Sequence, residues 1–394
     1  MRTDSLGFII ILGALAALPP LSIDMGLPAF GSLQQSLGAS AGQAALTLSV
    51  FMAGFGAAQI VVGPLSDRYG RRPVILSGLA LYAFSGLGCA LAPSIQILLS
   101  FRLIAGLAAA ASSTLALAVA RDLFEGDNAR VKLSAIATVS TIAPMIAPTL
   151  GGIVLAVGDW RFIYALLGTA GVIQFCLVWR LLSETRPPQP GSRINIIGRY
   201  GAVLRVRRTV GYALVNACGS AGMFSYISAS SAILMGRMGA STFLFGLLFA
   251  ATSGGIMLGA RINAALAHRR VRPAIPLAIA LTAAPLAALA GLLLLLAGYV
   301  QIETFVPPVI LFCVCRGLTN PNATHAALEQ VASHAGTAAS LLGCAQMLGG
   351  ALAGAAVAAS SPMLGIYSTS IGMLVCSSAA FLTWRWVETP APQT

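Results

Sequence analysis

The sequence predicts an all-α membrane protein in which twelve transmembrane helices form two pseudo-symmetric six-helix bundles. Hydrophobic residues make up 57% of its 394 residues and charged residues only 9%, whereas a soluble chain of this length needs more charge to cover its surface. Twelve stretches are apolar over the length of about 20 residues that a membrane span requires. Lysines and arginines are concentrated in alternate connections between these stretches, as in multi-pass proteins whose basic loops stay in the cytoplasm.

The twelve predicted spans are joined mostly by short connections, so neighbouring spans are expected to be antiparallel. They cover residues 7–29, 42–64, 73–92, 95–119, 133–157, 161–182, 210–234, 243–266, 274–298, 304–324, 337–359 and 363–386. The first is longer than the apolar core of a signal peptide and is interpreted as a retained span. The one long polar connection predicts an N-terminal bundle at 1–182, a basic cytoplasmic linker at 183–209 and a C-terminal bundle at 210–394. This linker either lies on anionic lipid or is simply solvated.

The distribution of basic residues predicts that both termini are cytoplasmic. With the N-terminus inside, only Arg161 and Arg237 fall in connections on the opposite side, and Arg102, Arg261 and Arg316 lie within spans. The net charge of +12 is therefore attributed to topology rather than to nucleic-acid binding. We expect a multi-pass protein of a bacterial inner membrane, with the lipid bilayer as its surroundings.

The two halves of the chain resemble each other. GPLSDRYGRRP connects spans 2 and 3, and GARINAALAHRRVRP connects spans 8 and 9. Span 4 begins after Pro93 with Arg102 further along, and span 10 has Pro307 and Pro308 before Arg316. Such repeats favour a secondary transporter whose substrate site lies near the midplane between its halves.

The segment from Gly63 to Pro73 combines a carboxylate, several cations and two glycines. We expect Gly63 to permit close helix contact and Gly70 to allow a tight turn. Asp67 beside a helix N-terminus and facing arginines can hold adjacent helices together on one side of the membrane. We call Gly63, Asp67, Arg68, Gly70, Arg71 and Arg72 the conformational latch. A simple basic loop on the cytoplasmic side is the alternative.

The G-x-L-x-D-R-x-G-R-R spacing of this latch resembles the signature between spans 2 and 3 of the major facilitator superfamily. The resemblance extends to its drug:proton antiporter branch with twelve spans, and within it to the Bcr/CflA (bicyclomycin and chloramphenicol resistance) family. The similar stretches are PLSIDMGLPA, FRLIAGLAAAAS, ARDLF, IAPMIAPTLGG, ETRPP, SAGMFSYISA and AGTAASLLG. The resemblance implies export of small amphipathic drugs in exchange for protons.

Asp24 lies near the far end of the first predicted span, in the stretch LSIDMGLP. A charge at bilayer depth costs about 2.5–3.5 kcal/mol on insertion scales, so such a residue is functional by default. Pro19 and Pro20 remove backbone donors just before it and predict a bent, locally polar helix. Dry surroundings favour a protonated carboxyl group, so we expect Asp24 to carry the coupling proton, as the resemblance also implies. The alternative is an interfacial aspartate that reaches the periplasm.

Arg102 is the predicted partner of Asp24, because an arginine within a span must face the bundle and find an acceptor. It matches the R-x-x-x-G pattern of the family together with Gly106, although Ala105 replaces a glutamine often found there. A structural arginine held by backbone carbonyls is the alternative. In span 5, Pro144 and Pro148 share one face and are expected to bend the helix, and Gly151 and Gly152 to admit a neighbouring helix. This pattern resembles the antiporter signature and argues against uptake symport.

Arg316 in span 10 matches no family pattern. It is predicted either to attract an anionic or dipolar substrate, or to pair with a carbonyl group or with Asp24. Further substrate-binding candidates are polar, aromatic or methionine side chains in the spans, which adapt to varied ligands, although ordinary helix packing explains each of them equally well. They are Met25, Met145, Asn216, Phe224, Tyr226, Asn320, Gln346 and Met347.

These observations predict a proton-coupled efflux transporter of amphipathic drugs such as amphenicols or bicyclomycin, working by alternating access. The alternatives are a proton-driven exporter of a sugar or amino-acid derivative and a membrane sensor that does not transport. No catalytic arrangement, phosphate-binding loop or metal-ligand spacing occurs in the sequence, so we expect neither an enzyme nor a cofactor, and the proton gradient as the energy source. The expected partners are a small drug or metabolite and protons, with no nucleic acid, and the protein is expected to act as a monomer.

Overall fold

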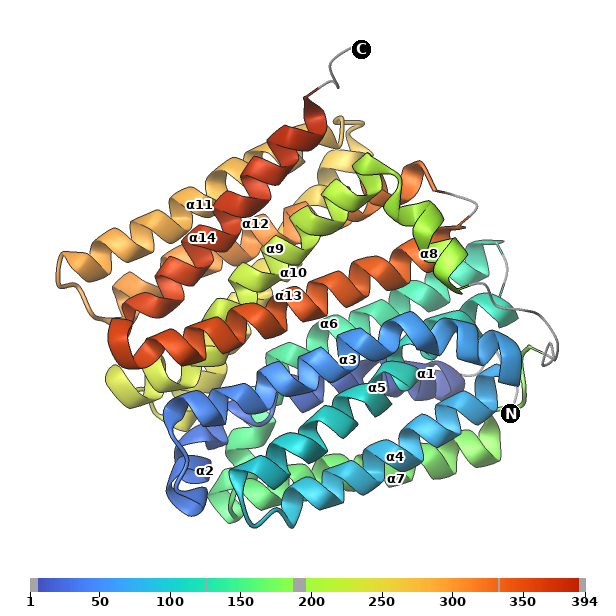
Figure 1. The fold of residues 1–394 in the computed structure, drawn as a ribbon, viewed down its shortest axis with the longest axis horizontal. Coiled ribbons are helices and arrows are strands. Elements are labelled where there is room, and N and C mark those ends of the chain that lie inside the picture. Colours follow the sequence, from blue (N-terminus) through green and yellow to red (C-terminus); the bar gives the residue numbers. More distant parts are fainter. Residues whose placement is uncertain (1–5, 125, 187–195, 332–333, 390–394) are drawn as a thin grey trace. The chain divides into compact units, whose positions relative to one another are not determined.

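The computed structural model describes residues 6–124, 126–186, 196–331 and 334–389. The chain divides into two compact units, Met1–Ile194 and Asn195–Thr394, and every regular element in the described ranges is helical (Figure 1). The first unit contains α1 (Leu6–Asp24), the 3-10 turn η1 (Leu27–Ala29), α2 (Phe30–Leu37), α3 (Ala41–Tyr69), α4 (Arg71–Ala90), α5 (Ile95–Leu123), α6 (Gly126–Val157) and α7 (Trp160–Leu181).

The second unit begins with a short helix and continues with six long ones. It contains α8 (Ile196–Leu204), α9 (Arg207–Ser231), the π-helical segment η2 (Ala232–Arg237), α10 (Thr242–His268), α11 (Ala274–Leu296), α12 (Ile302–Glu329), α13 (Ala335–Leu364) and α14 (Tyr367–Glu388). Each unit thus has six long helices within its described residues, which agrees with the predicted fold class.

Ten stretches of the described helices are long and apolar enough to cross a membrane, the first of them running from Gly7 to Leu37. Helices α9 and α14 reach spanning length but contain more serine and threonine. Their hydroxyl groups bond to carbonyls of the same helix, as Ser225 does to Ala221 and Ser377 does to Met373. Such bonds satisfy polar side chains without a partner from water, so these two helices also suit an apolar environment.

The two units share one pattern of helix pairing. In the first unit α1 packs against α5 and α6, α3 against α5, and α4 against α5 and α7. In the second unit α9 packs against α12 and α13, α10 against α12, and α11 against α12 and α14. Counting the long helices of each unit from its start, the same five pairs pack in both, which confirms the resemblance between the halves.

Glycines set the closest of these contacts, between the second and fourth long helices of each unit. A Cβ atom at Gly106 of α5 would collide with the Phe51 carbonyl of α3, and one at Gly54 with the Leu103 carbonyl. In the second unit Gly317 of α12 faces the Ile256 carbonyl of α10 in the same way. Without side chains at these positions the helix backbones approach closely, a packing mode typical of membrane helices.

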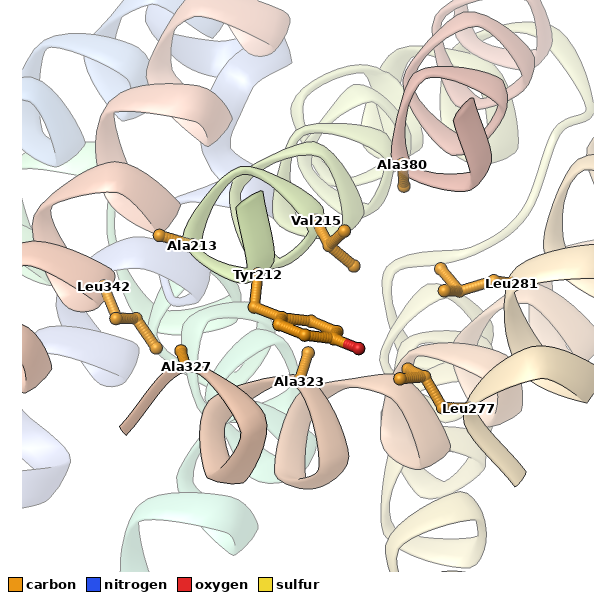
Figure 2. Packing of buried hydrophobic residues seen from close by; sticks show 9 residues of the cluster. All are labelled: Tyr212, Ala213, Val215, Leu277, Leu281, Ala323, Ala327, Leu342 and Ala380. Atoms are coloured by element: carbon orange, nitrogen blue, oxygen red, sulfur yellow. The ribbon is translucent and has the colours of Figure 1, made fainter. Parts of the chain in front are cut away.

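An apolar cluster joins five helices of the second unit (Figure 2). Its buried members are Tyr212, Ala213, Val215, Leu277, Leu281, Ala323, Ala327, Leu342 and Ala380. Four of these nine are alanines, so α9, α11, α12, α13 and α14 meet over small side chains. The larger side chains of Tyr212, Leu277 and Leu281 fill the space between them (Figure 2).

The predicted linker at 183–209 is described at 183–186 and 196–209. Helix α8 lies within it and packs against α9 and α13, with Val203 buried beside Val331 and Ala338. Part of this stretch is therefore a folded helix of the second unit rather than an extended connection. Arg193 lies outside the described residues, and the domain limits inferred from the sequence stay predictions.

Replacing Gly106 by valine should destabilise the first unit, because the new side chain would overlap the Phe51 carbonyl. Overpacking of this kind costs about 1–3 kcal/mol, so the melting temperature of the purified protein should fall. Gly31→Ala in α2 is the matched control, because no described atom lies within 4 Å of its Cβ position. Equal melting temperatures for both variants would contradict the close α3–α5 contact.

Candidate functional site

Asp24 is the last residue of α1, and the helix ends directly after it. Pro19 and Pro20 lie inside α1, and the chain then turns through Met25 and Gly26 into η1. The helix thus continues through both prolines and ends at the carboxylate, and the predicted bend at the prolines stays a prediction. A helix that ends within a bundle leaves backbone carbonyls of its last turn without intrahelical partners, which makes this place polar.

Asp24 is buried, with only 3% of its surface exposed. Among the described residues it is the one buried acid, and its Oδ1 atom has no hydrogen-bond partner there. A buried carboxylate without partners is costly, whereas its protonated form is tolerated far better. These surroundings suit a group that exchanges a proton.

Arg102 lies two turns into α5 and is also 3% exposed. Its Nη2 donates to the Ser22 carbonyl at the end of α1 and its Nε to the Thr47 carbonyl of α3, both at 3.1 Å. The guanidinium lies 4.3 Å from the centre of the Phe51 ring. No ion pair joins Arg102 to Asp24 within 4.0 Å among the described residues, so the geometry is that of the alternative, an arginine held by backbone carbonyls.

Two tyrosines and a serine that the sequence analysis did not single out surround this arginine. The Ser22 hydroxyl bonds to the Tyr82 hydroxyl and donates to the Leu18 carbonyl at 2.8 Å. The Tyr164 ring lies 5.6 Å from the Arg102 guanidinium. Isolated hydroxyl-bearing residues in apolar spans carry little signal, because most of them bond to their own helix.

Helix α6 contains both predicted prolines, Pro144 and Pro148, within one continuous helix. A Cβ atom at Gly151 would collide with the Met25 carbonyl, so this glycine admits the end of α1 just after Asp24. Gly152 and Met145 are half-buried on the same helix. Gly151 thus admits a close neighbour, which is the turn directly after the buried carboxylate of Asp24.

The conformational latch is mostly helical rather than a loop, which corrects the sequence interpretation. Helix α3 continues to Tyr69 and α4 begins at Arg71, so only Gly70 lies between them. Gly70 has a φ angle of +95°, which side-chain-bearing residues rarely adopt. Polar residues at helix ends prolong the helices because their side chains satisfy the terminal backbone groups.

Arg71 of the latch connects α4, on which it lies, with α3 and α5. It pairs with Asp67 of α3 at 3.1 Å and with Asp122 of α5 at 3.0 Å, and it donates to the Ser66 hydroxyl. Arg186, which follows α7, also pairs with Asp67 at 3.2 Å. Arg68 instead lies 5.3 Å from the centre of the Tyr69 ring.

Glu184 caps the N-terminus of α4. Its carboxylate accepts hydrogen bonds from the backbone N–H groups of Arg71 at 2.8 Å and Arg72 at 3.1 Å. A carboxylate at this position satisfies two donors and complements the positive end of the helix dipole. The Arg72 side chain donates to the Trp179 carbonyl at 2.6 Å. Asp122 and Glu184 were missed as members of the latch, although ARDLF and ETRPP contain them.

Gly63 makes no close contact in the first unit. Apart from its chain neighbours and its own helix backbone, no described atom lies within 4 Å of the position of its Cβ, so the close helix contact expected there is not made within the first unit and stays a prediction. Gly54, two and a half turns earlier on α3, makes that contact instead.

Two predicted substrate-binding residues of the second unit, Asn216 and Gln346, contact a third, Arg316, which is 7% exposed. Arg316 donates from Nη1 to Asn216 Oδ1 at 3.0 Å and from Nη2 to Gln346 Oε1 at 3.3 Å. A third bond runs from Nη2 to the Ser220 hydroxyl at 2.8 Å, a partner that the sequence analysis missed. The Asn216 amide also donates to the Thr324 hydroxyl at 3.2 Å.

The other candidates form no common cluster with Arg316. Tyr226 is buried with its ring 6.3 Å from that of Phe305, and Phe224 is buried on the same helix. Met347 is half-buried and Asn320 is exposed. Asn322, which was not a candidate, donates to Asn263 Oδ1 at 2.6 Å and so links α12 to α10. No group of three or more potential metal ligands occurs among the described residues.

A family model described as Major Facilitator Superfamily matches residues 9–354. The chain belongs to the Major Facilitator Superfamily. It is a multi-pass membrane transporter rather than an enzyme.

Three curated relatives narrow the comparison within the superfamily. The "Uncharacterized MFS-type transporter YdgK" of Bacillus subtilis is 31% identical over 93% of this chain and 90% of its own. The "Bicyclomycin resistance protein homolog" of Haemophilus influenzae is 30% identical, with 91% of both chains covered. The "Chloramphenicol resistance protein" of Pseudomonas aeruginosa is 31% identical over 64% of this chain and 60% of its own. These names confirm the resemblance found in the sequence.

Solved structures of transporters share the fold. A bacterial homologue of the human lysosomal transporter Spinster, in an inward-facing and occupied conformation, matches with a TM-score of 0.76 at 15% identity over 100% of both chains. A D-xylose–proton symporter matches with a TM-score of 0.71 at 16% identity over 99% of both chains. At such low identity the likeness shows the fold alone.

Glu184→Gln should weaken the conformational latch, because the neutral amide loses the charge that caps α4. Loss of hydrogen bonds to a charged group costs about 1–3 kcal/mol, so the purified variant should melt at a lower temperature than the wild type. Glu329→Gln at the exposed end of α12 removes the same charge and should not change the melting temperature. A Glu184→Gln variant as stable as this control would show that the cap does not contribute.

Proposed function

We propose that the protein is a proton-coupled antiporter that exports small amphipathic drugs, such as amphenicols or bicyclomycin, from the cytoplasm. The observation that carries the proposal is Asp24, a buried carboxyl group at the end of α1 whose Oδ1 has no partner among the described residues. An ionisable group inside a membrane span is a functional site by default. The names of the Haemophilus and Pseudomonas relatives support the drug class.

In the proposed cycle a proton from the periplasm neutralises Asp24 and is released on the cytoplasmic side. Arg102 lies close to the end of α1 that carries Asp24, since its guanidinium donates to the carbonyl of Ser22, two residues before Asp24. When Asp24 is ionised, its charge attracts the guanidinium away from the Ser22 carbonyl. Protonation returns Arg102 to that carbonyl. Proton binding then shifts the population of two conformations, and drug binding shifts it the other way.

The conformational latch supports alternating access at the opposite end of the first unit. Its ion pair between Arg186 and Asp67 joins two partly exposed side chains, and such a pair contributes only about 0–1 kcal/mol. Contacts this weak can form and separate within a transport cycle. We place the latch and both termini in the cytoplasm of a bacterial cell, with the protein as a monomer in the inner membrane and the proton gradient as its energy source.

Asp24→Asn should abolish proton-coupled efflux, because an amide cannot exchange a proton at neutral pH. The measurement is transport by inverted membrane vesicles of amphenicols, bicyclomycin and cationic dyes under an imposed pH gradient. Binding of the same compounds to the purified variant should survive. Glu303→Gln, at the exposed start of α12, is the matched control and should transport normally. Normal proton exchange by Asp24→Asn would place the coupling elsewhere.

Arg102→Lys should reduce efflux at least tenfold although it keeps the positive charge. A lysine lacks the planar fork that reaches two carbonyls at once, so the end of α1 loses its bond to α5. The same vesicle assay measures the loss, and Arg121→Lys at the other end of α5 serves as the control. Transport by Arg102→Lys at the rate of this control would rule out a role for the two carbonyl bonds.

A further inference from the structure

Arg316 lies midway along α12, far from the carboxylates of its own helix. Glu303 stands at the start of α12 and Glu329 at its end. At 1.5 Å per residue, each lies roughly 20 Å from Arg316 along the helix axis. Neither carboxylate can therefore act as the counter-charge of this guanidinium.

The second unit contains one further acidic side chain. Residues 195–394 contain three acids, and the third is Glu388. Its Oε1 atom accepts from the Tyr212 hydroxyl at 2.5 Å and lies 3.8 Å from Arg208. Glu388 is thus bound at the first turns of α9, so the guanidinium of Arg316 has no carboxylate within its unit.

Neutral oxygen atoms hold Arg316 instead. Its three recorded partners are the side chains of Asn216, Ser220 and Gln346, from α9 and α13. They orient the guanidinium but leave its charge uncompensated within the second unit, which is unfavourable for an arginine that is only 7% exposed. A buried cation kept in place by neutral acceptors is the arrangement expected of a receptor for an anion.

The guanidinium also has unused N–H bonds and adjoins a small cavity. It carries five N–H bonds, of which three are used by partners among the described residues. A cavity of about 20 Å³ adjoins Arg316 and is lined also by Phe312 and Thr319, which is room for one oxygen-sized group.

We propose that Arg316 binds a carboxylate on those transported compounds that carry one, so that an amphipathic monoanion is preferred over an uncharged compound of the same shape. This inference rests on the proposed exporter function and names its substrate class. The carboxylate displaces Gln346, whose 3.3 Å contact is the longest of the three, and accepts from the Nη2 N–H freed in this way together with the Nε N–H on the same edge of the guanidinium.

The test compares each carboxylate with its uncharged amide. Binding of 1-naphthoate and 1-naphthamide, 2-naphthoxyacetate and its amide, and 4-nitrobenzoate and its amide is measured on the purified full chain in detergent, without a proton gradient. We expect the wild type to bind at least one carboxylate at least tenfold more tightly than its amide. Arg316→Gln should remove this preference and change the affinity for the amide less than twofold.

Two further variants make the result specific. Arg261→Gln removes the same charge from an exposed position of α10 and should keep the full preference. Arg316→Lys keeps the charge but loses the planar fork, and should weaken carboxylate binding threefold to tenfold. It also tests the proposal if Arg316→Gln does not fold.

Several results would overturn the inference. A wild type that prefers none of the carboxylates over its amide is one, and an Arg316→Gln variant that keeps the preference is another. A variant that weakens carboxylate and amide equally would make Arg316 a structural residue. Because binding is measured without a gradient, failure here is distinguishable from failure of the proposed proton-coupled export, which the vesicle assay reports.

Discussion

Each helical unit contains a buried guanidinium that must be stabilised without a carboxylate among its described neighbours. Removing a charge from water costs several kcal/mol unless good hydrogen bonds replace the lost solvent. Arg102 meets this requirement with two backbone carbonyls and the face of the Phe51 ring, and Arg316 with three neutral side chains. Both arginines lie on the fourth long helix of their unit, which therefore connects its neighbours through one cation.

The requirement explains why the backbones near these arginines are so close. Arg102 reaches the Thr47 carbonyl only because α5 lies directly against α3, and Gly106, one turn beyond the arginine, makes that approach possible. Gly317 stands next to Arg316 and lets α12 approach α10 in the same manner. In both units, small residues let two helix backbones approach closely, and the arginine beside them forms hydrogen bonds to neighbouring helices.

The charges of the latch are stabilised differently from those of Arg102 and Arg316. Asp67, Arg71, Asp122 and Glu184 lie at helix ends, where water shares the stabilisation and opposite charges pair directly. Arg71 is as buried as Arg316, at 7% exposed, whereas the Arg186–Asp67 pair joins two partly exposed side chains and is weak enough to break and re-form. The first unit thus combines firmly held arginines with a more labile ion pair at one end, a combination that suits a protein that changes conformation.

Composition and spacing predicted the fold class and the twelve long helices, the stretch from Gly63 to Arg72 carried the resemblance to the family, and charges within apolar stretches made Asp24, Arg102 and Arg316 candidates. These signals are local, because hydropathy depends on residue type and a charge inside an apolar stretch is visible in the sequence. Only the tertiary structure decided which groups meet: Arg102 with the Ser22 carbonyl, Glu184 with the first turn of α4, and Arg316 with Ser220. Every residue has a backbone carbonyl, so the sequence does not show which carbonyl accepts a hydrogen bond. Helices far apart in the chain pack according to the shapes of their surfaces. Such contacts therefore depend on packing that no single stretch of sequence encodes.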